Sequence, residues 1–202
     1  MPEFELWDIH IHSSPESLDA KQSVNQILSH CSIALAGIVL TNHDTFSDQI
    51  YHHLEVKYDI KVLMGAEITT NKGHFLVFGL KDPPPAPPVP FTLLVDMVRD
   101  LNLACVAAHP LAEEPYGLSE DLRVLNNKPV SIHALEINGK WGQKKTVQAL
   151  ADRWLLPTVG GSDAHKTDQL NTMATLFPGG IDCIDSLVSY IRKGRCRAYP
   201  VR

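Results

Sequence analysis

The segment Asp8-Ile9-His10-Ile11-His12 alternates polar and apolar residues, as a half-buried β-strand does. Side chains two residues apart in a strand share a face, so His10 and His12 point to one side and the isoleucines to the other. Two neighbouring imidazoles at the end of a strand can bind a transition metal together. Because a His-x-His pair also occurs on an ordinary polar strand face, the rest of the chain must decide between these interpretations.

Residue types that bind metals recur at the ends of other predicted strands. They are His43 and Asp44 after residues 38–40, Glu67 after 62–64, His109 after 104–108, and Asp163 and His165 after 158–159. In parallel α/β folds the carboxyl ends of the strands form one functional face, so we expect these side chains to meet there. Imidazoles mixed with carboxylates suit Zn²⁺, Mn²⁺ or Fe²⁺, and paired ions of this kind support phosphoester hydrolysis.

Strand and helix patterns alternate along the 202 residues. Strand patterns occur at residues 4–11, 38–40, 62–64, 73–80, 104–108, 134–137 and 158–159, and helical patterns at 21–34, 47–58, 91–101, 119–125, 144–154 and 184–191. This order predicts an α/β fold with mainly parallel strands, and about seven strands fit either an open sheet or a closed barrel. The proline-rich segment 81–90 is predicted to be a stiff loop, and residues 1–202 to form one domain.

Charge and cysteine usage narrow the function classes. A net charge of −5 and a pI near 6.0 argue against a nucleic-acid scaffold held by bulk electrostatics. They leave open an enzyme that acts on a nucleotide, where bound cations would supply the positive charge. The four scattered cysteines, with no signal peptide and no run long enough to span a membrane, predict a reduced, cytoplasmic setting and no membrane partner.

Read together, the strand-end motifs resemble those of the PHP (polymerase and histidinol phosphatase) domain family in its small phosphoesterase form. The motifs occur in order as Asp8–His12, Thr41–Asp44, Gly65–Glu67, His74, Ala107–Pro110, Glu136–Asn138 and Gly161–His165. The resemblance implies a distorted (β/α)7 barrel that holds two or three divalent ions (Zn, Mn or Fe). It also implies a metal-dependent phosphoesterase that hydrolyses a phosphomonoester or a short nucleotide substrate, including oligonucleotides, with a metal-activated hydroxide.

The same resemblance assigns three ligand sets. The first metal would take His10, His12, Glu67 and Asp163, the second Glu67, His74 and His109, and the third His43, His165 and an aspartate from the loop after the first strand. The usual aspartate positions hold Ser17 and Leu18, so Asp19 is the expected substitute and Glu16 its rival. Asp163, His43 and His165 are also the candidate catalytic residues, and either histidine could donate a proton if the third site is empty.

Several polar residues have both a functional and a structural interpretation. Asp8 and Asp44 could orient ligands or close turns, and Glu136 and Asn138 could contact substrate or stabilise the barrel rim. His133 is expected to be structural, and His30, His52 and His53 to be surface residues. Candidate phosphate-binding side chains are Lys140, Lys144, Lys145 and Lys166.

The competing functional hypothesis is a metal-stabilised, non-catalytic regulatory or binding module, as in some PHP domains attached to polymerases. A zinc hydrolase acting on amides is a third, although it would want a different ligand order. The length leaves little room for a substrate-capping domain, so we expect a fairly open site. The substrate and the oligomeric state are left open by the sequence.

Overall fold

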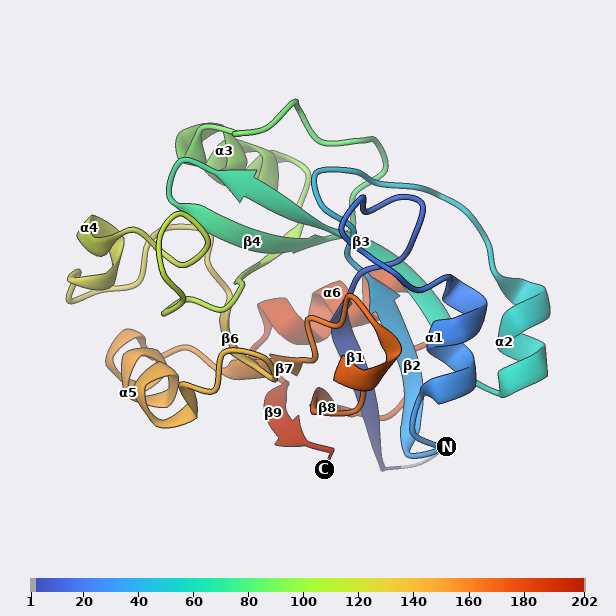
Figure 1. Ribbon diagram of the computed structural model, residues 1–202. Coiled ribbons are helices and arrows are strands. Elements are labelled where there is room, and N and C mark those ends of the chain that lie inside the picture. The colour runs from blue at the N-terminus through green and yellow to red at the C-terminus, as the bar shows by residue number, and fades with distance from the viewer. Residues whose placement is uncertain (1–2, 202) are drawn as a thin grey trace.

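The computed structural model describes residues 3–201, whose strands form one mixed sheet of nine strands (Figure 1). The strand order across the sheet is β7-β6-β5-β4-β3-β2-β1-β8-β9. The strands are β1 (Phe4–Ile11), β2 (Leu35–Leu40), β3 (Lys61–Thr70), β4 (Gly73–Phe78), β5 (Ala104–Ala107), β6 (Ala134–Asn138), β7 (Thr158–Gly161), β8 (Met173–Pro178) and β9 (Arg197–Pro200). The prediction of a single domain over residues 1–202 stays a prediction, since residues 1, 2 and 202 lie outside this range.

The sheet curls until its first and seventh strands meet. Just past β7, the backbone N–H of Asp163 donates to the carbonyl of His10 (2.8 Å), and the N–H of His12 donates to the carbonyl of Ala164 (3.0 Å). These bonds nearly close the sheet into a barrel with helices packed around it (Figure 1). The predicted distorted α/β barrel is thereby confirmed.

The strand directions differ from the expected, mainly parallel pattern. Strands β1, β2 and β3 pair in parallel, as do β5, β6 and β7, but β4 is antiparallel to both of its neighbours. The cause is the short turn at Asn71 and Lys72, since such a connection can join only antiparallel strands. The C-terminal strands β8 and β9, which the sequence pattern did not reveal, add antiparallel pairs beside β1.

The helices lie where predicted, although the first four are shorter than expected. They are α1 (Val24–His30), α2 (His52–Tyr58), α3 (Phe91–Asp100), α4 (Glu120–Arg123), α5 (Lys144–Trp154) and α6 (Ile184–Arg192), with a 3₁₀ turn at Thr167–Gln169. A capping box between Ser23 and Gln26 starts α1 and shortens the predicted helix. The predicted helix at residues 47–58 begins only at His52, because the hydroxyl of Ser47 accepts from the backbone N–H of Gln49 in a local turn.

The proline-rich loop, the cysteines and the absence of a membrane span among residues 3–201 can be compared with the sequence-based expectations. Residues 81–90 form an irregular and largely exposed connector, as predicted, with Val89 buried and paired to the end of β3. Each of the four cysteines has a free thiol. Within residues 3–201, no helix is both long and apolar enough to cross a membrane.

The core on one side of the sheet is built around Trp7, whose side chain is fully buried. Its indole lies against Gly37 of the neighbouring strand, where an added Cβ would fall 2.3 Å from a ring carbon. Such a distance is far below van der Waals contact. The close approach therefore requires glycine at this position and lets the largest side chain of β1 lie flat on β2.

We predict that Gly37→Ala destabilises the protein by about 1–3 kcal/mol, the usual cost of overpacking a core. The free energy of unfolding in urea measures the loss. In a Trp7→Phe background the smaller ring leaves room for the methyl group, so the same substitution should cost less there. Equal costs in the two backgrounds would show that the contact with Trp7 is not the cause.

His133 is a half-buried residue that ties β6 to β5 through an uncharged ring. Its Nδ1 accepts a hydrogen bond from the backbone N–H of Cys105 (3.1 Å). Burial, together with the charges of Arg192 and Lys128, lowers the pKa of His133 to about 4. A neutral ring is required because a protonated Nδ1 would face the Cys105 donor with a second hydrogen. This placement agrees with the structural role expected for His133.

This shift makes stability depend on pH. An unfolded histidine has a pKa of about 6.5, so between pH 6.5 and 4 the unfolded chain binds more protons at this position than the folded one. The stabilising contribution is therefore complete above pH 6.5 and declines as the pH falls toward 4. His133→Gln should flatten the decline measured by urea unfolding at several pH values, whereas the exposed-site control His53→Gln should keep it.

Candidate metal centre

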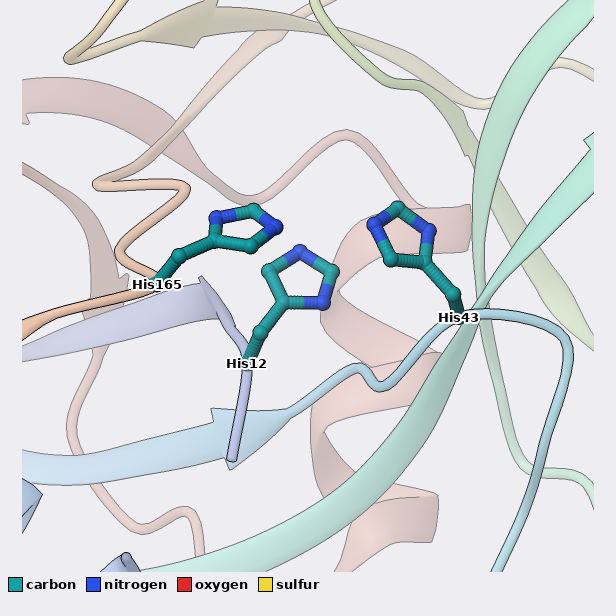
Figure 2. Close-up of side chains that lie close together, drawn as sticks. All are labelled: His12, His43 and His165. Atoms are coloured by element: carbon teal, nitrogen blue, oxygen red, sulfur yellow. The ribbon is translucent and has the colours of Figure 1, made fainter. Parts of the chain in front are cut away.

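The strand-end residues predicted to bind metal come together at one end of the barrel. His10 and His12 lie at the end of β1, His43 follows β2, Glu67 lies within β3 and His74 begins β4. His109, Asp163 and His165 follow β5 and β7 and complete the cluster, whose inner members are almost entirely buried. Figure 2 shows the rings of His12, His43 and His165, which come from three separate segments and lie close together.

Glu67 stands at the centre of this cluster. Its Oε2 lies 3.1 Å from Nε2 of His10, 3.2 Å from Nε2 of His12 and 3.3 Å from Nδ1 of His43. Its Oε1 lies 2.9 Å from both Nδ1 of His74 and Nε2 of His109. The two carboxylate oxygens thus face separate groups of histidines.

The atoms expected to hold the first metal are spaced as ligands are. Five distances among Nε2 of His10, Nε2 of His12, Oε2 of Glu67 and Oδ1 of Asp163 run from 3.1 to 3.6 Å. Ligands about 2.0–2.2 Å from an ion in a tetrahedron lie about 3.3–3.6 Å from one another. These residues therefore fit a divalent ion. The buried Nδ1 of His109 has no hydrogen-bond partner in the described part of the chain, so it is a further nitrogen that could bind an ion.

Several groups of three histidine, aspartate or glutamate residues have potential ligand atoms within 4.8 Å of one another. These groups match the second and third expected ligand sets only in part. His74 groups with Glu67 and His43, while His109 groups with His10 and Asp163. The remaining groups are His10 with His12 and Glu67, and His12 with His43 and His165. Every predicted ligand except Asp19 appears in at least one group, but the division between neighbouring ions is less clear than the resemblance implied.

Asp19 lies at the outer edge of the cluster. Its Oδ2 is 2.9 Å from Nε2 of His165 and 3.5 Å from Nε2 of His43, and its side chain is 56% exposed. Glu16, the alternative, instead accepts a hydrogen bond from the hydroxyl of Ser13 (3.4 Å). This geometry favours Asp19 as the third carboxylate and leaves the outer group more accessible to solvent than the inner one.

Buried carboxylates hold the ligands in place from behind. Glu136 is fully buried, with Oε1 2.8 Å from Nδ1 of His10 and Oε2 accepting from the backbone N–H of His109 (2.8 Å). Asp8 is also buried and accepts from the backbone of Ser162 (3.0 Å). A carboxylate on the far nitrogen of a ligand histidine sets its tautomer and orientation. Glu136 therefore supports the cluster from the barrel interior.

Other candidates have structural contacts. Asp44 accepts from the backbone N–H of Thr69 (2.7 Å) and closes a turn against β3. Asn138 accepts from the backbone N–H of Lys140 (2.8 Å). The side chains of His30, His52 and His53 are exposed, as expected.

Sequence reasoning missed three residues of the site. Ser17 is buried, and its Oγ lies 3.3 Å from Nδ1 of His12 and accepts from the backbone N–H of His43 (3.0 Å). Tyr116 and Trp141 lie in loops after β5 and β6, and Trp141 donates through Nε1 to Oδ2 of Asp163 (3.3 Å). The sequence analysis noted Ser17 at a usual aspartate position but did not predict these contacts. The two aromatic residues carried no local signal.

The cluster sets the charge of its own members. Burial alone would raise the pKa values of Glu67 and Asp163, but the charge of His10 and hydrogen bonds from the histidines hold both well below their usual range. Burial likewise opposes protonation of His10, yet the carboxylates of Glu136 and Glu67 raise its pKa well above the usual value. Two ionised carboxylates in a buried site require a positive partner, which can be protonated histidine or a metal ion.

The outer histidines behave differently. Burial lowers the pKa of His43 to about 4 and also lowers the pKa of His165. Both rings are therefore neutral near pH 7, the form in which imidazole binds metals.

The cluster opens into a pocket of about 310 Å³. It is lined by Asp19, His43, Glu67, His74, His109, Tyr116, Lys140, Trp141, Asp163 and His165. Asp19 and Lys140 on its rim are 56% and 43% exposed, so the cluster is not roofed and the expected open site is found. Among the other candidate lysines, Lys166 pairs with Asp168 (3.2 Å), while Lys144 and Lys145 are exposed on α5.

A larger cleft of about 860 Å³ lies at the opposite end of β1, β2 and β3, where Phe4, Leu35 and Lys61 line it. Among the described residues, no group of side chains that could hold a metal ion includes a residue of this cleft. A large volume without candidate metal ligands does not indicate a catalytic site, so we assign the functional site to the smaller pocket.

We predict that Glu136→Gln weakens metal binding by about 10–100-fold, because the charge that orients His10 is lost. Isothermal titration of the metal-free protein with Zn²⁺ or Mn²⁺ measures the affinity. Glu113→Gln, a change at an exposed carboxylate, serves as the control and should bind like the wild type. An unchanged affinity in Glu136→Gln would exclude a supporting role for this carboxylate.

Comparison with known proteins adds a family and a fold. The family PHP_C, described as PHP-associated, matches residues 143–196. No curated protein matches the chain. Among solved structures, PsfC from Pseudomonas syringae PB-5123 is similar with a TM-score of 0.72 and 19% identity, over 98% of this chain and 92% of that one.

Two further structures share the fold. One is a two-domain protein from Bacteroides vulgatus ATCC 8482 containing a predicted PHP-like metal-dependent phosphoesterase (TM-score 0.67, 20% identity, 98% of this chain). The other is the lesion-specific endonuclease PfuEndoQ from Pyrococcus furiosus (TM-score 0.66, 13% identity, 96% of this chain). The chain spans 65% and 57% of the lengths of these two proteins. The family match over residues 143–196 and the shared fold agree with the resemblance to PHP domains.

Proposed function

We propose that this protein is a metal-dependent phosphoesterase that hydrolyses a phosphoester at a cluster of two or three divalent ions, with Zn²⁺, Mn²⁺ or Fe²⁺ as the candidates. The observation that carries the proposal is Glu67, whose two buried oxygens face histidines on both sides within 3.3 Å. A buried carboxylate shared in this way is typical of centres that hold paired ions for phosphoester chemistry.

The proposed assignment of ligands is the one that the family resemblance implies. His10, His12, Glu67 and Asp163 would hold the first ion, and Glu67, His74 and His109 the second. His43 and His165 would complete a third site with Asp19. The pKa of about 4 at His43 favours its use as a ligand over its use as a proton donor, because the ring carries no proton to give near pH 7.

Bound divalent ions would supply positive charge for the phosphoryl oxygens and a water of lowered pKa. The chain's own residues then do the positioning. Glu136 orients His10, and Trp141 orients Asp163. Lys140, with Nζ 3.8 Å from Oδ2 of Asp163, can reach a phosphate placed over the cluster.

The substrate class is small and phosphorylated, with a phosphomonoester or a short nucleotide as the candidates. The net charge of −5 makes capture of a long nucleic acid by bulk electrostatics unfavourable. Similar folds occur in a predicted phosphoesterase and an endonuclease, which supports phosphoester chemistry in general rather than one substrate. The free thiols support the proposed cytoplasmic setting.

The test is metal content and turnover measured on the same sample. Protein purified without chelator should contain two or three transition-metal ions per chain by elemental analysis. With added Mn²⁺ it should hydrolyse p-nitrophenyl phosphate or its bis ester. Glu67→Gln should lower both the metal content and kcat/KM, the latter by at least about 100-fold, because it removes the shared ligand. His53→Gln, at an exposed site, is the matched control.

The two hypotheses give different results in this experiment. Full metal occupancy without hydrolysis across a broad phosphoester panel would favour the regulatory or binding module. Protein that binds no transition metal would contradict both.

A further inference from the structure

A second pocket, of about 590 Å³, lies at the end of the barrel opposite the metal centre. Among its lining residues, Gly79 directly follows β4 and Asn102 lies just before β5. The other ends of the same two strands carry His74 and His109 of the metal centre. We propose that this pocket binds a small molecule that carries a diphosphate group. The two sites are separate, so the inference does not depend on the proposed phosphoesterase activity.

The base of the pocket is built where α6 packs against the end of β4. Val188 of α6 is buried, and a Cβ added at Gly79 would lie 3.2 Å from its Cγ2. Gly79 also has a φ of 94°, in the region that favours glycine. The polar side chains around this base are Lys81, Asn102, Asp185, Ser189, Arg192 and Lys193. Charged and hydrogen-bonding groups thus surround a packed apolar base.

Three of these side chains are cations whose charge is not balanced by a neighbouring carboxylate. Lys81 and Lys193 are exposed, and within residues 3–201 neither ammonium group forms an ion pair or a hydrogen bond. Arg192 donates from Nη1 to the carbonyl of Leu103 (2.7 Å). That bond uses one of the five N–H groups of the guanidinium, so it anchors the side chain and leaves donors for a ligand.

The surroundings of Arg192 are positively charged, although the whole chain has a net charge of −5. Burial is the main cause of the lowered pKa of His133, and the charges of Arg192 and Lys128 add to it. Cations gathered in one place repel one another, and an anion bound between them removes this repulsion. The pocket therefore attracts anions at a place where most of the chain does not.

Charge and size together select the class of ligand. Three cations against the single carboxylate of Asp185 leave an excess of positive charge that one singly charged anion does not balance. Two linked phosphates carry several negative charges and enough oxygens to contact a guanidinium and both ammonium groups at once. About 590 Å³ lies within the range of small-molecule sites, about 300–1,000 Å³, so an organic group attached to the diphosphate also fits.

The test is an amide-resolved NMR titration of the whole, Zn²⁺-loaded chain with methylenediphosphonate, a diphosphate analogue that the metal centre cannot hydrolyse. The amide signals of Gly79, Asn102 and Ser189 report the proposed pocket, and those of Trp141 and His165 report the metal centre. Metal content is measured before and after the titration. The pocket signals should shift and saturate, and inorganic phosphate should bind there about 10-fold more weakly or less, because it brings fewer charges.

Single substitutions identify the charges that take part. Lys81→Gln and Lys193→Gln should each weaken binding by about 3–10-fold, because each removes a charge-assisted contact. Asp185→Asn should strengthen binding by a similar factor, because it removes the one negative charge that faces the ligand. Lys57→Gln, which removes a charge from an exposed site on α2 outside the pocket, is the matched control and should bind like the wild type.

The opposite effects expected at Lys193 and Asp185 separate a defined site from general attraction of anions to the chain. Shifts confined to the metal-centre signals, no saturation at the pocket signals, or equal affinity in all four variants would each overturn the inference. Adenosine diphosphate then distinguishes the two sources of the group. Tighter binding than methylenediphosphonate through the same amides would identify an organic diphosphate as the ligand, and equal binding would identify the diphosphate group alone.

Discussion

The structure depends on a buried negative charge at the centre of the barrel. Glu67 is fully buried and surrounded by the histidines of four other segments, and an ionised carboxylate in such a place is unfavourable without a positive partner. The nitrogens of the surrounding histidines contact its oxygens, and divalent ions could balance the same charge. Burial of this ionised carboxylate therefore destabilises the fold unless a proton on a histidine or a metal ion balances its charge.

Backbone hydrogen bonds of the barrel hold the side chains around Glu67 in place. Hydrogen bonds between the end of β1 and the segment after β7 bring His10 and His12 beside Asp163. Both His109 and Asp163 have positive φ angles, of 26° and 54°, which non-glycine residues adopt at a cost. His109 is held in that conformation by Glu136, and Asp163 by the carbonyl of His10. The hydrogen bonds that close the sheet are therefore the ones that bring these candidate ligands together.

Around this rigid inner group lies a more open outer one. Asp19, Lys140 and Tyr116 are all substantially exposed and come from separate loops. Loops of this kind vary without disturbing the barrel. Under the proposed function, the inner residues would hold the ions and the outer residues would contact the substrate.

Much of the inner site could be predicted because its signals are local. The alternation at Asp8–His12 and the polar residues after the apolar runs mark strand ends directly. Errors arose where pairing was non-local. The antiparallel β8 and β9 were missed because their sequences show no clear alternation and depend on β1 for their partners. Helix ends were misplaced by a few residues because caps such as Ser23 act within single turns.

The sequence by itself determined the α/β class and the residue types gathered at the strand ends, since strand periodicity and side-chain chemistry are properties of neighbouring residues. The closed barrel was implied only by the family resemblance. Only the tertiary structure decided which atoms meet. The two-sided contacts of Glu67, the contact of Glu136 with His10 and the contact of Asp19 with His165 all join segments far apart in the chain. The position of the two aromatic residues that line the metal-centre pocket was invisible for the same reason: Tyr116 and Trp141 become neighbours only when the loops after β5 and β6 fold over the cluster.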